Sequence, residues 1–215
     1  MNIPNISTFR FLAPAAALCL MGILAGCNIA QPAQDDPTRY FVLSDPVGPA
    51  KEGAVAPGAA RIGLKAVKIE GYLKRREIVV RTGENEVEFR DYRRWAEPLE
   101  AALSRVLRAR LLSSADVAQV SVEPFPTDQD RDFDVSVEVR RCEGLAPRSG
   151  KTGASFVAIF EISTSGPNPR VVQRKTFVAP DSAWDGTDYD RLANLLTADA
   201  SALGQEILAA LPPKA

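Results

Sequence analysis

Hydrophobic positions recur with two different periods along the chain. Apolar residues at positions 133, 135, 137 and 139 alternate strictly with polar residues at 134, 136, 138 and 140, which predicts a strand buried on one face. Residues 97–112 instead carry apolar side chains three, four and one positions apart, which predicts one face of a helix. Pro98 suits the first turn of that helix, and the arginines at 105, 108 and 110 suit the negative end of its dipole.

The same patterns place the other elements. A second helix is predicted at residues 189–211, where Leu192, Leu196, Leu203 and Ile207 fall on one stripe and Asp188 or Thr187 is expected to cap the first turn. Further strands are predicted at residues 39–43, 61–69, 77–81, 86–89, 117–122, 154–163 and 170–177.

The order of these elements predicts an α+β fold. Strands, a helix, more strands and a last helix follow one another without β-α-β alternation, which favours a mainly antiparallel sheet with two long helices packed on one face. Turn residues at 82–85 join two strands into a hairpin. Residues 61–69 are apolar on both faces and are expected in the centre of the sheet. Residues 39–212 are predicted to form a single domain.

The N-terminal segment has the pattern of a lipoprotein signal. Residues 11–25 are almost entirely apolar and follow Arg10, the only basic residue among the first 26. The run is too short to span a bilayer and is typical of an export signal. Leu24, Ala25, Gly26 and Cys27 match the site at which a lipoprotein is cut. We therefore predict a signal peptide at residues 1–26 and lipidation at Cys27; a secretory signal or an uncleaved anchor with an incidental cysteine is the alternative.

The residues after Cys27 predict a tethered location. Residues 28–38 are rich in Gln, Pro, Asp and Ala and form a flexible tether, which reaches about 36 Å at roughly 3.3 Å per residue. Several acyl chains hold a protein on a membrane far better than one. Asn28 stands where lipoproteins retained at the inner membrane usually carry Asp, so we expect the periplasmic face of the outer membrane.

Composition excludes several classes of function. The chain contains no histidine, which removes the commonest general base, the standard triads and the most frequent zinc ligand. Its 26 basic and 27 acidic residues give no basic excess for nucleic acid. Once Cys19 leaves with the signal and Cys27 is lipidated, Cys142 has no disulfide partner, and we expect it to be structural.

Two motifs fail as ligand sites. The acidic run at 128, 130, 132 and 134 lacks the glycine and the distant glutamate of a calcium loop, so we expect a solvated turn. Gly150, Lys151 and Thr152 resemble the end of a phosphate loop, but Leu145 stands where its first glycine is needed. No catalytic residue, cofactor or metal is predicted.

The block at residues 71–99 interleaves arginines with aromatic residues. Tyr72, Arg75, Tyr92 and Trp95 are its candidate contacts with a partner or a second copy, because Trp, Tyr and Arg are enriched at protein interfaces. Two alternatives stay open from the residues alone. Trp95 and Tyr92 could pack the helix against the sheet, or the block could stack on nucleic acid.

Three motifs together resemble one family. They are Tyr-Phe-Val-Leu at 40–43, V-x-I-x-x-Y-L-x-R at 67–75, and Y-x-x-W-A-x-P-L at 92–99. In this combination the chain resembles the ABC-type transport auxiliary lipoproteins, over nearly its whole length.

The resemblance implies a function without catalysis. It implies a periplasmic lipoprotein that works with a mammalian-cell-entry (MCE) domain protein and inner-membrane transport components, docking or stabilising the outer-membrane end of a lipid conduit. It also implies that copies can form a ring. Two other functions are weighed against it, a lipid carrier with its own cavity and a hydrolase.

Overall fold

The computed structural model describes residues 35–44 and 56–213. The predicted signal peptide, Cys27 and the tether up to residue 34 lie outside the described residues. Contacts between Cα atoms group Thr38–Ala215 into one compact unit, and the description below concerns that unit.

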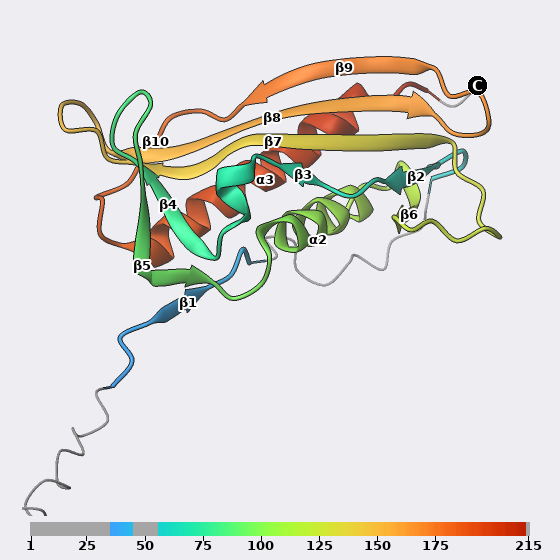
Figure 1. Ribbon diagram of the computed structural model, residues 1–215. Coiled ribbons are helices and arrows are strands. Elements are labelled where there is room, and N and C mark those ends of the chain that lie inside the picture. The colour runs from blue at the N-terminus through green and yellow to red at the C-terminus, as the bar shows by residue number, and fades with distance from the viewer. Residues whose placement is uncertain (1–34, 45–55, 214–215) are drawn as a thin grey trace, which may run out of the picture. The chain divides into compact units, whose positions relative to one another are not determined.

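Ten strands, two helices and one 3₁₀ turn make up the described part of this unit (Figure 1). The helices are α2 (Leu99–Leu112) and α3 (Tyr189–Ala210), and the 3₁₀ turn is η2 (Gly71–Lys74). The strands are β1 (Arg39–Phe41), β2 (Ala60–Leu64), β3 (Lys68–Ile69), β4 (Glu77–Arg81), β5 (Val87–Trp95), β6 (Val117–Val122), β7 (Phe133–Leu145), β8 (Gly153–Thr164), β9 (Val171–Val178) and β10 (Ser182–Ala183).

The sheet is mixed, so the expectation of a mainly antiparallel sheet was wrong. On one side of β7 the strands run antiparallel, β7 with β8 and β8 with β9. Along its other side β7 pairs in parallel with β2, β3 and β4 in turn. The period of two reports which face of a strand is buried and carries no information on its direction, and the crossover through α2 brings β6 parallel to β2.

The strand expected at residues 61–69 is split. Its first part, β2, lies between β6 and β7, which confirms a central position. Lys65 still donates its N–H to Val135, but the N–H of Ala66 turns to the Glu123 carboxylate. Pairing resumes only at β3.

The predicted hairpin is present and longer than expected. Strands β4 and β5 pair antiparallel, and β5 continues to Trp95, where it pairs in parallel with β1. The register between β4 and β5 shifts between Glu77 and Ile78. The hairpin therefore links the first strand of the unit to the rest of the sheet.

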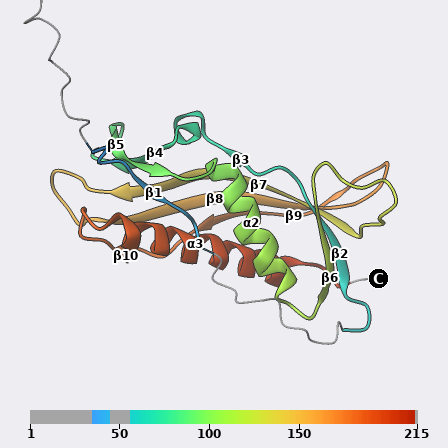
Figure 2. The same ribbon diagram turned by 90° about the horizontal axis from the view of Figure 1, so that it is seen from below.

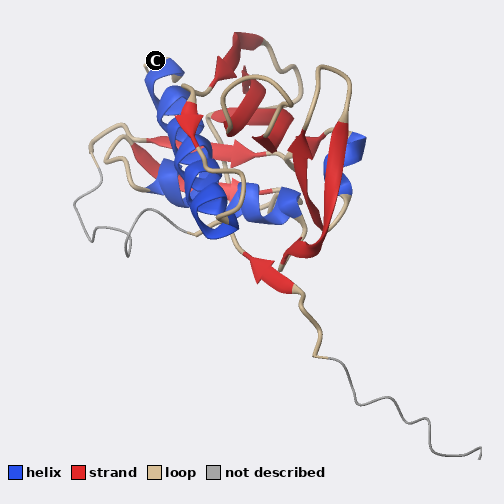
Figure 3. Cartoon of the chain, turned by 90° about the vertical axis from the view of Figure 1, so that its left-hand side faces the viewer, coloured by secondary structure: helices blue, strands red, loops and turns tan. Residues whose placement is uncertain are grey.

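Both predicted helices form. Helix α2 begins after Pro98, two residues later than expected, and α3 begins after Asp188, whose side chain accepts a hydrogen bond from the Arg191 N–H. In Figure 2, seen from below, both helices lie in front of the sheet. They meet at Gly204, where an added Cβ would lie 2.8 Å from the Cγ of Arg110. Figure 3 shows both helices and the sheet from the left-hand side of Figure 1.

The core fills the space between the sheet and the helices. Its largest fully buried side chains include Phe156, Phe160, Leu103, Leu107 and Leu192. These come from β8, α2 and α3, so the apolar stripes of both helices face the sheet.

Cys142 is buried although its place in the alternation put it on the polar side of the strand. The ladder between β7 and β8 shifts register between Val139 and Arg141. Such a bulge adds one residue to one strand and reverses the faces beyond it. The thiol therefore enters the core, in the structural role expected for it.

Candidate interaction surfaces

Trp95 occupies the core and not a surface. Its side chain is 3% exposed, and it pairs in register with Phe41 of β1. Of the roles that the sequence left open, packing is the one this residue has. Trp95 is therefore not exposed to contact a partner, because it is buried at the end of β5, and the pattern of aromatic residues and arginines does not show which of them are buried.

Tyr72 is half-buried on turn η2. Its hydroxyl donates to the backbone oxygen of Arg140 at 3.1 Å, and the guanidinium of Arg81 lies 5.9 Å from the centre of its ring. Burial, with the nearby Glu143 carboxylate, raises the pKa of Tyr72 to about 12. The ring is therefore a fixed, neutral contact that leaves part of its surface free.

Arg75, between η2 and β4, and Tyr92, in β5, are both exposed. The guanidinium of Arg75 lies 4.6 Å from the centre of the Phe89 ring in β5 and pairs with Glu77 at 3.4 Å. Tyr92 is 53% exposed farther along β5. The three candidate side chains therefore belong to η2, to the segment after it and to the hairpin, with Tyr72 held against β7 and Arg75 against Phe89.

Among the described residues, Glu143, Asp199 and Cys142 are ionisable groups buried in the interior. Glu143 is fully buried, and its Oε1 lies 2.6 Å from the Nε of Arg81, while its Oε2 has no partner. Asp199 of α3 is 6% exposed, its Oδ2 has no partner, and burial raises its pKa to about 6. Burial also raises the pKa of the Cys142 thiol far above its usual range. A protonated, inaccessible thiol is not a nucleophile.

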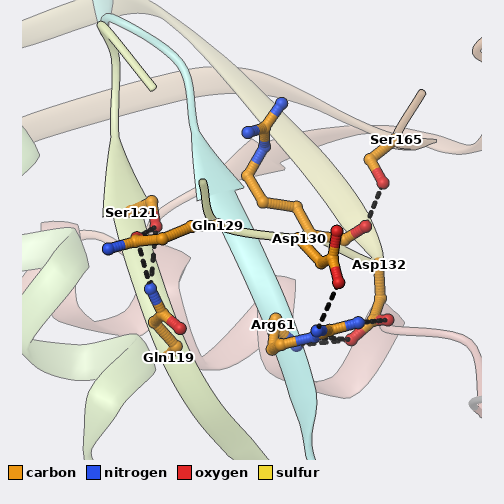
Figure 4. A network of polar contacts seen from close by, with 8 residues as sticks. Arg61, Gln119, Ser121, Gln129, Asp130, Asp132 and Ser165 are labelled. Carbon is orange, nitrogen blue, oxygen red and sulfur yellow. Dashed lines mark hydrogen bonds and ion pairs between the residues drawn. The ribbon is translucent and has the colours of Figure 1, made fainter. Parts of the chain in front are cut away.

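Two aspartates of the acidic run before β7 form ion pairs with an arginine of another strand. Arg61 of β2 lies against Asp130 and Asp132 (Figure 4). Its Nη2 is 3.1 Å from Asp132 Oδ1, its Nη1 is 3.4 Å from Asp130 Oδ2, and its backbone N–H donates to Asp132 at 2.7 Å. Asp134 pairs in turn with Arg131 at 3.0 Å. The expected solvated turn is thus partly a structural clamp between β2 and the start of β7.

The strand predicted at residues 170–177 forms as β9, but the sequence analysis did not predict that it would be exposed. Seven of its eight residues are exposed, among them Val171, Val172 and Val178. Its charged residues, Arg174 and Lys175, interrupt the apolar alternation, which was the available signal of an edge strand.

Two further observations bear on function. Over residues 35–44 and 56–213, no group of three or more acidic or cysteine side chains is placed to hold a metal ion. No helix within those ranges is long and apolar enough to cross a membrane.

Two solved structures of other proteins have a fold similar to this one. A protein from Xanthomonas campestris with a crystal structure is 17% identical, over 80% of this chain and 93% of its own, with a TM-score of 0.65. A second crystal structure, of an uncharacterised protein, is 19% identical over 79% and 95% of the two chains, with a TM-score of 0.57. The curated proteins contain no match.

The family comparison covers most of the chain. The sequence model of the ABC-type transport auxiliary lipoprotein component matches residues 41–208. That range runs from the end of β1 to the last turn of α3 and so includes both helices and all the remaining strands. The chain therefore belongs to the ABC-type transport auxiliary lipoprotein family.

Proposed function

We propose that this protein is the membrane-anchored, non-catalytic docking component of an MCE-type system that moves lipid between the inner and outer membranes. Family membership supports the role of an auxiliary lipoprotein, and the absence of histidine is consistent with a role that requires no chemistry. Cys27 is the site of the anchor in this proposal, on the periplasmic face of the outer membrane.

The filled core is the observation that favours docking over carriage of lipid. The apolar faces of both helices pack against the sheet. Their residues Leu103, Leu107 and Leu192 are fully buried, as is Phe160 of the sheet. A hollow of about 600 Å³ lies between the loop at 56–60 and the C-terminal ends of the two helices. Arg110, Asp116 and Gln205 line it together with apolar residues such as Leu208 and Leu211, so it is not the uniformly apolar cavity that an acyl chain would favour.

The hairpin side of the unit is the proposed contact with a partner or with another copy in a ring. Tyr72, Arg75 and Tyr92 present rigid aromatic and guanidinium surface there, and such side chains dominate interface energetics. Tyr72 and Arg75 are held by Arg140 and Phe89, so little side-chain entropy is lost on binding.

Co-purification tests this function. The full lipidated chain, crosslinked in its own cell envelope, should retain the MCE-domain protein, and Tyr92→Ala should reduce the yield of that complex. The matched control is Arg108→Ala, since Arg108 is exposed on α2, outside turn η2 and the hairpin. Crosslinked envelopes in which the wild type retains no MCE-domain protein would contradict the proposal, and phospholipid bound to the purified protein would favour carriage instead.

Palmitate labelling tests the anchor separately. Wild type should incorporate label and Cys27→Ser should not. Equal labelling of the two proteins would end the assignment of Cys27, whatever the result with the partner.

A further inference from the structure

Strand β9 has a free edge. It pairs with β8 on one side only, and no other described strand pairs with it. A free edge presents unpaired backbone N–H and C=O groups that can template another strand. The β8–β9 ladder keeps a regular register from Val178 back to Gln173, shifts once between Gln173 and Val171, and contains no proline.

The ladder defines which backbone groups are free. The N–H of Ala179 donates to the Phe156 oxygen at 3.0 Å. Antiparallel pairs alternate between bonded and non-bonded positions, so Phe177 and Lys175 bond to β8. The N–H and C=O groups of Arg174, Thr176 and Val178 therefore point away from β8, toward the free edge.

The side chains at this edge are apolar and cationic. Val171, Val172 and Val178 are 58%, 42% and 65% exposed, which makes them half of the exposed large hydrophobic residues among the described residues. The segment 170–178 contains three basic residues and no acidic one. Lys175 pairs with Glu206 of α3, whereas the Arg174 side chain has Glu161 opposite it in register without an ion pair closer than 4.0 Å.

The positive charge of β9 favours an acidic strand over a second copy of this chain as the partner at its free edge. If two copies paired through β9, each would bring the same cationic side chains to the other, and like charges across a ladder are destabilising. An acidic strand would meet opposite charges instead and would bury the valines.

We propose that the free edge of β9 binds an extended, acidic segment of a partner protein by strand addition. The backbone of Arg174, Thr176 and Val178 supplies the hydrogen bonds, the valines supply apolar contact, and Arg170 and Arg174 select acidic side chains. This deepens the proposed function, because it names a second contact of the docking component and the chemistry of the segment that docks.

A pair of synthetic peptides tests the edge directly. Nine-residue peptides of alternating valine with either glutamate or lysine are added to the full lipidated chain in detergent micelles, and amide exchange is followed at residues 174, 176 and 178. We expect the glutamate peptide to slow exchange at these three amides and the lysine peptide to leave it unchanged. Equal protection by both peptides, or by neither, would overturn the proposal and leave the arginines as charges that keep the edge unpaired.

Variants separate the backbone from the charges. Thr176→Pro removes one outward N–H and should abolish protection, whereas Thr176→Ala should retain it. Arg170→Glu with Arg174→Glu should weaken binding of the glutamate peptide by roughly tenfold and favour the lysine peptide. If the charge reversal leaves the affinity for both peptides unchanged, β9 does not select an acidic segment.

The outcomes are independent of the co-purification experiment. Peptide binding with no retained MCE-domain protein would overturn the proposed function and leave the edge site standing. Retention of that protein with no peptide protection would do the reverse.

Discussion

Strands β8 and β9 are neighbours in one ladder but lie in opposite environments. Strand β8 alternates between buried and half-buried residues, and Phe156, Phe160 and Ile162 lie against the helices. Strand β9 is exposed along nearly its whole length. The difference arises because α3 packs mainly against β8 and contacts β9 much less, with Glu206 of α3 paired to Lys175. One strand therefore belongs to the core, and the other is exposed.

The largest difference is expected for phenylalanines on the two strands. Phe160→Ala should lower the free energy of unfolding by about 3–5 kcal/mol, because Phe160 is fully buried and its loss leaves a cavity. Phe177→Ala on β9 should cost about 1–2 kcal/mol, since its ring is partly exposed and contacts Phe156 on one side. Urea unfolding of both variants measures the contrast, and similar losses would show that β9 is covered in solution.

A buried carboxyl under the covered half of the sheet should lower stability at neutral pH. Burial raises the pKa of Asp199 from 3.8 to about 6, so the folded state binds a proton that the unfolded state releases. Stability should fall as pH rises between about 4 and 6 and stay level above that range. Asp199→Asn should flatten this dependence and add up to about 3 kcal/mol above pH 6.

The control for this variant lies on the same helix. Glu206→Gln removes an acid from α3 that is paired with Lys175 at the surface, and exposed pairs contribute little. Unfolding measured from pH 4 to 8 should therefore change for Asp199→Asn and not for Glu206→Gln. A wild-type curve that rises across this range would contradict the assignment to Asp199.

The close contact beneath β7 should not tolerate a methyl group. A Cβ at Gly144 would lie 2.7 Å from a ring carbon of Trp184 and 3.2 Å from Leu192. Gly144→Ala should cost about 1–3 kcal/mol through overpacking. Gly71→Ala, where an added Cβ meets nothing within 4 Å, should stay within about 0.5 kcal/mol. Thermal unfolding of the pair is the measurement, and a tolerant Gly144 would mean that Trp184 can move aside.

Periodicity predicted the elements better than their surroundings. The alternation at 133–139 and the stripe at 99–107 report local burial, so β7 and α2 were found within two residues at the starts of both elements. The direction of β2 against β7 depends on a crossover far along the chain, and the burial of Cys142 depends on a bulge. Neither leaves a periodic signal in the sequence.

The candidate contact residues also differ in burial in a way that the sequence pattern does not show. Tyr92 and Trp95 belong to one motif and one strand, yet one is exposed and the other is buried beside β1. Their composition indicated an interface, but only the packing of β1 and α3 around the end of β5 separates the two roles. The free edge of β9 was missed because a period of two is the same in a central strand and an edge strand.

The smallest expected effect is the most informative about the edge. Val137→Thr on β7 places a hydroxyl in the core, where the side chain is 2% exposed, and should cost about 1–3 kcal/mol. The same change at Val172 or Val178 keeps the β-branched shape, meets water, and should stay within about 0.5 kcal/mol. Urea unfolding of the isolated protein gives both values. If the β9 variants cost as much as the core variant and the loss grows with protein concentration, the valines pack against a second copy, and the free edge belongs to the ring instead of to an acidic partner.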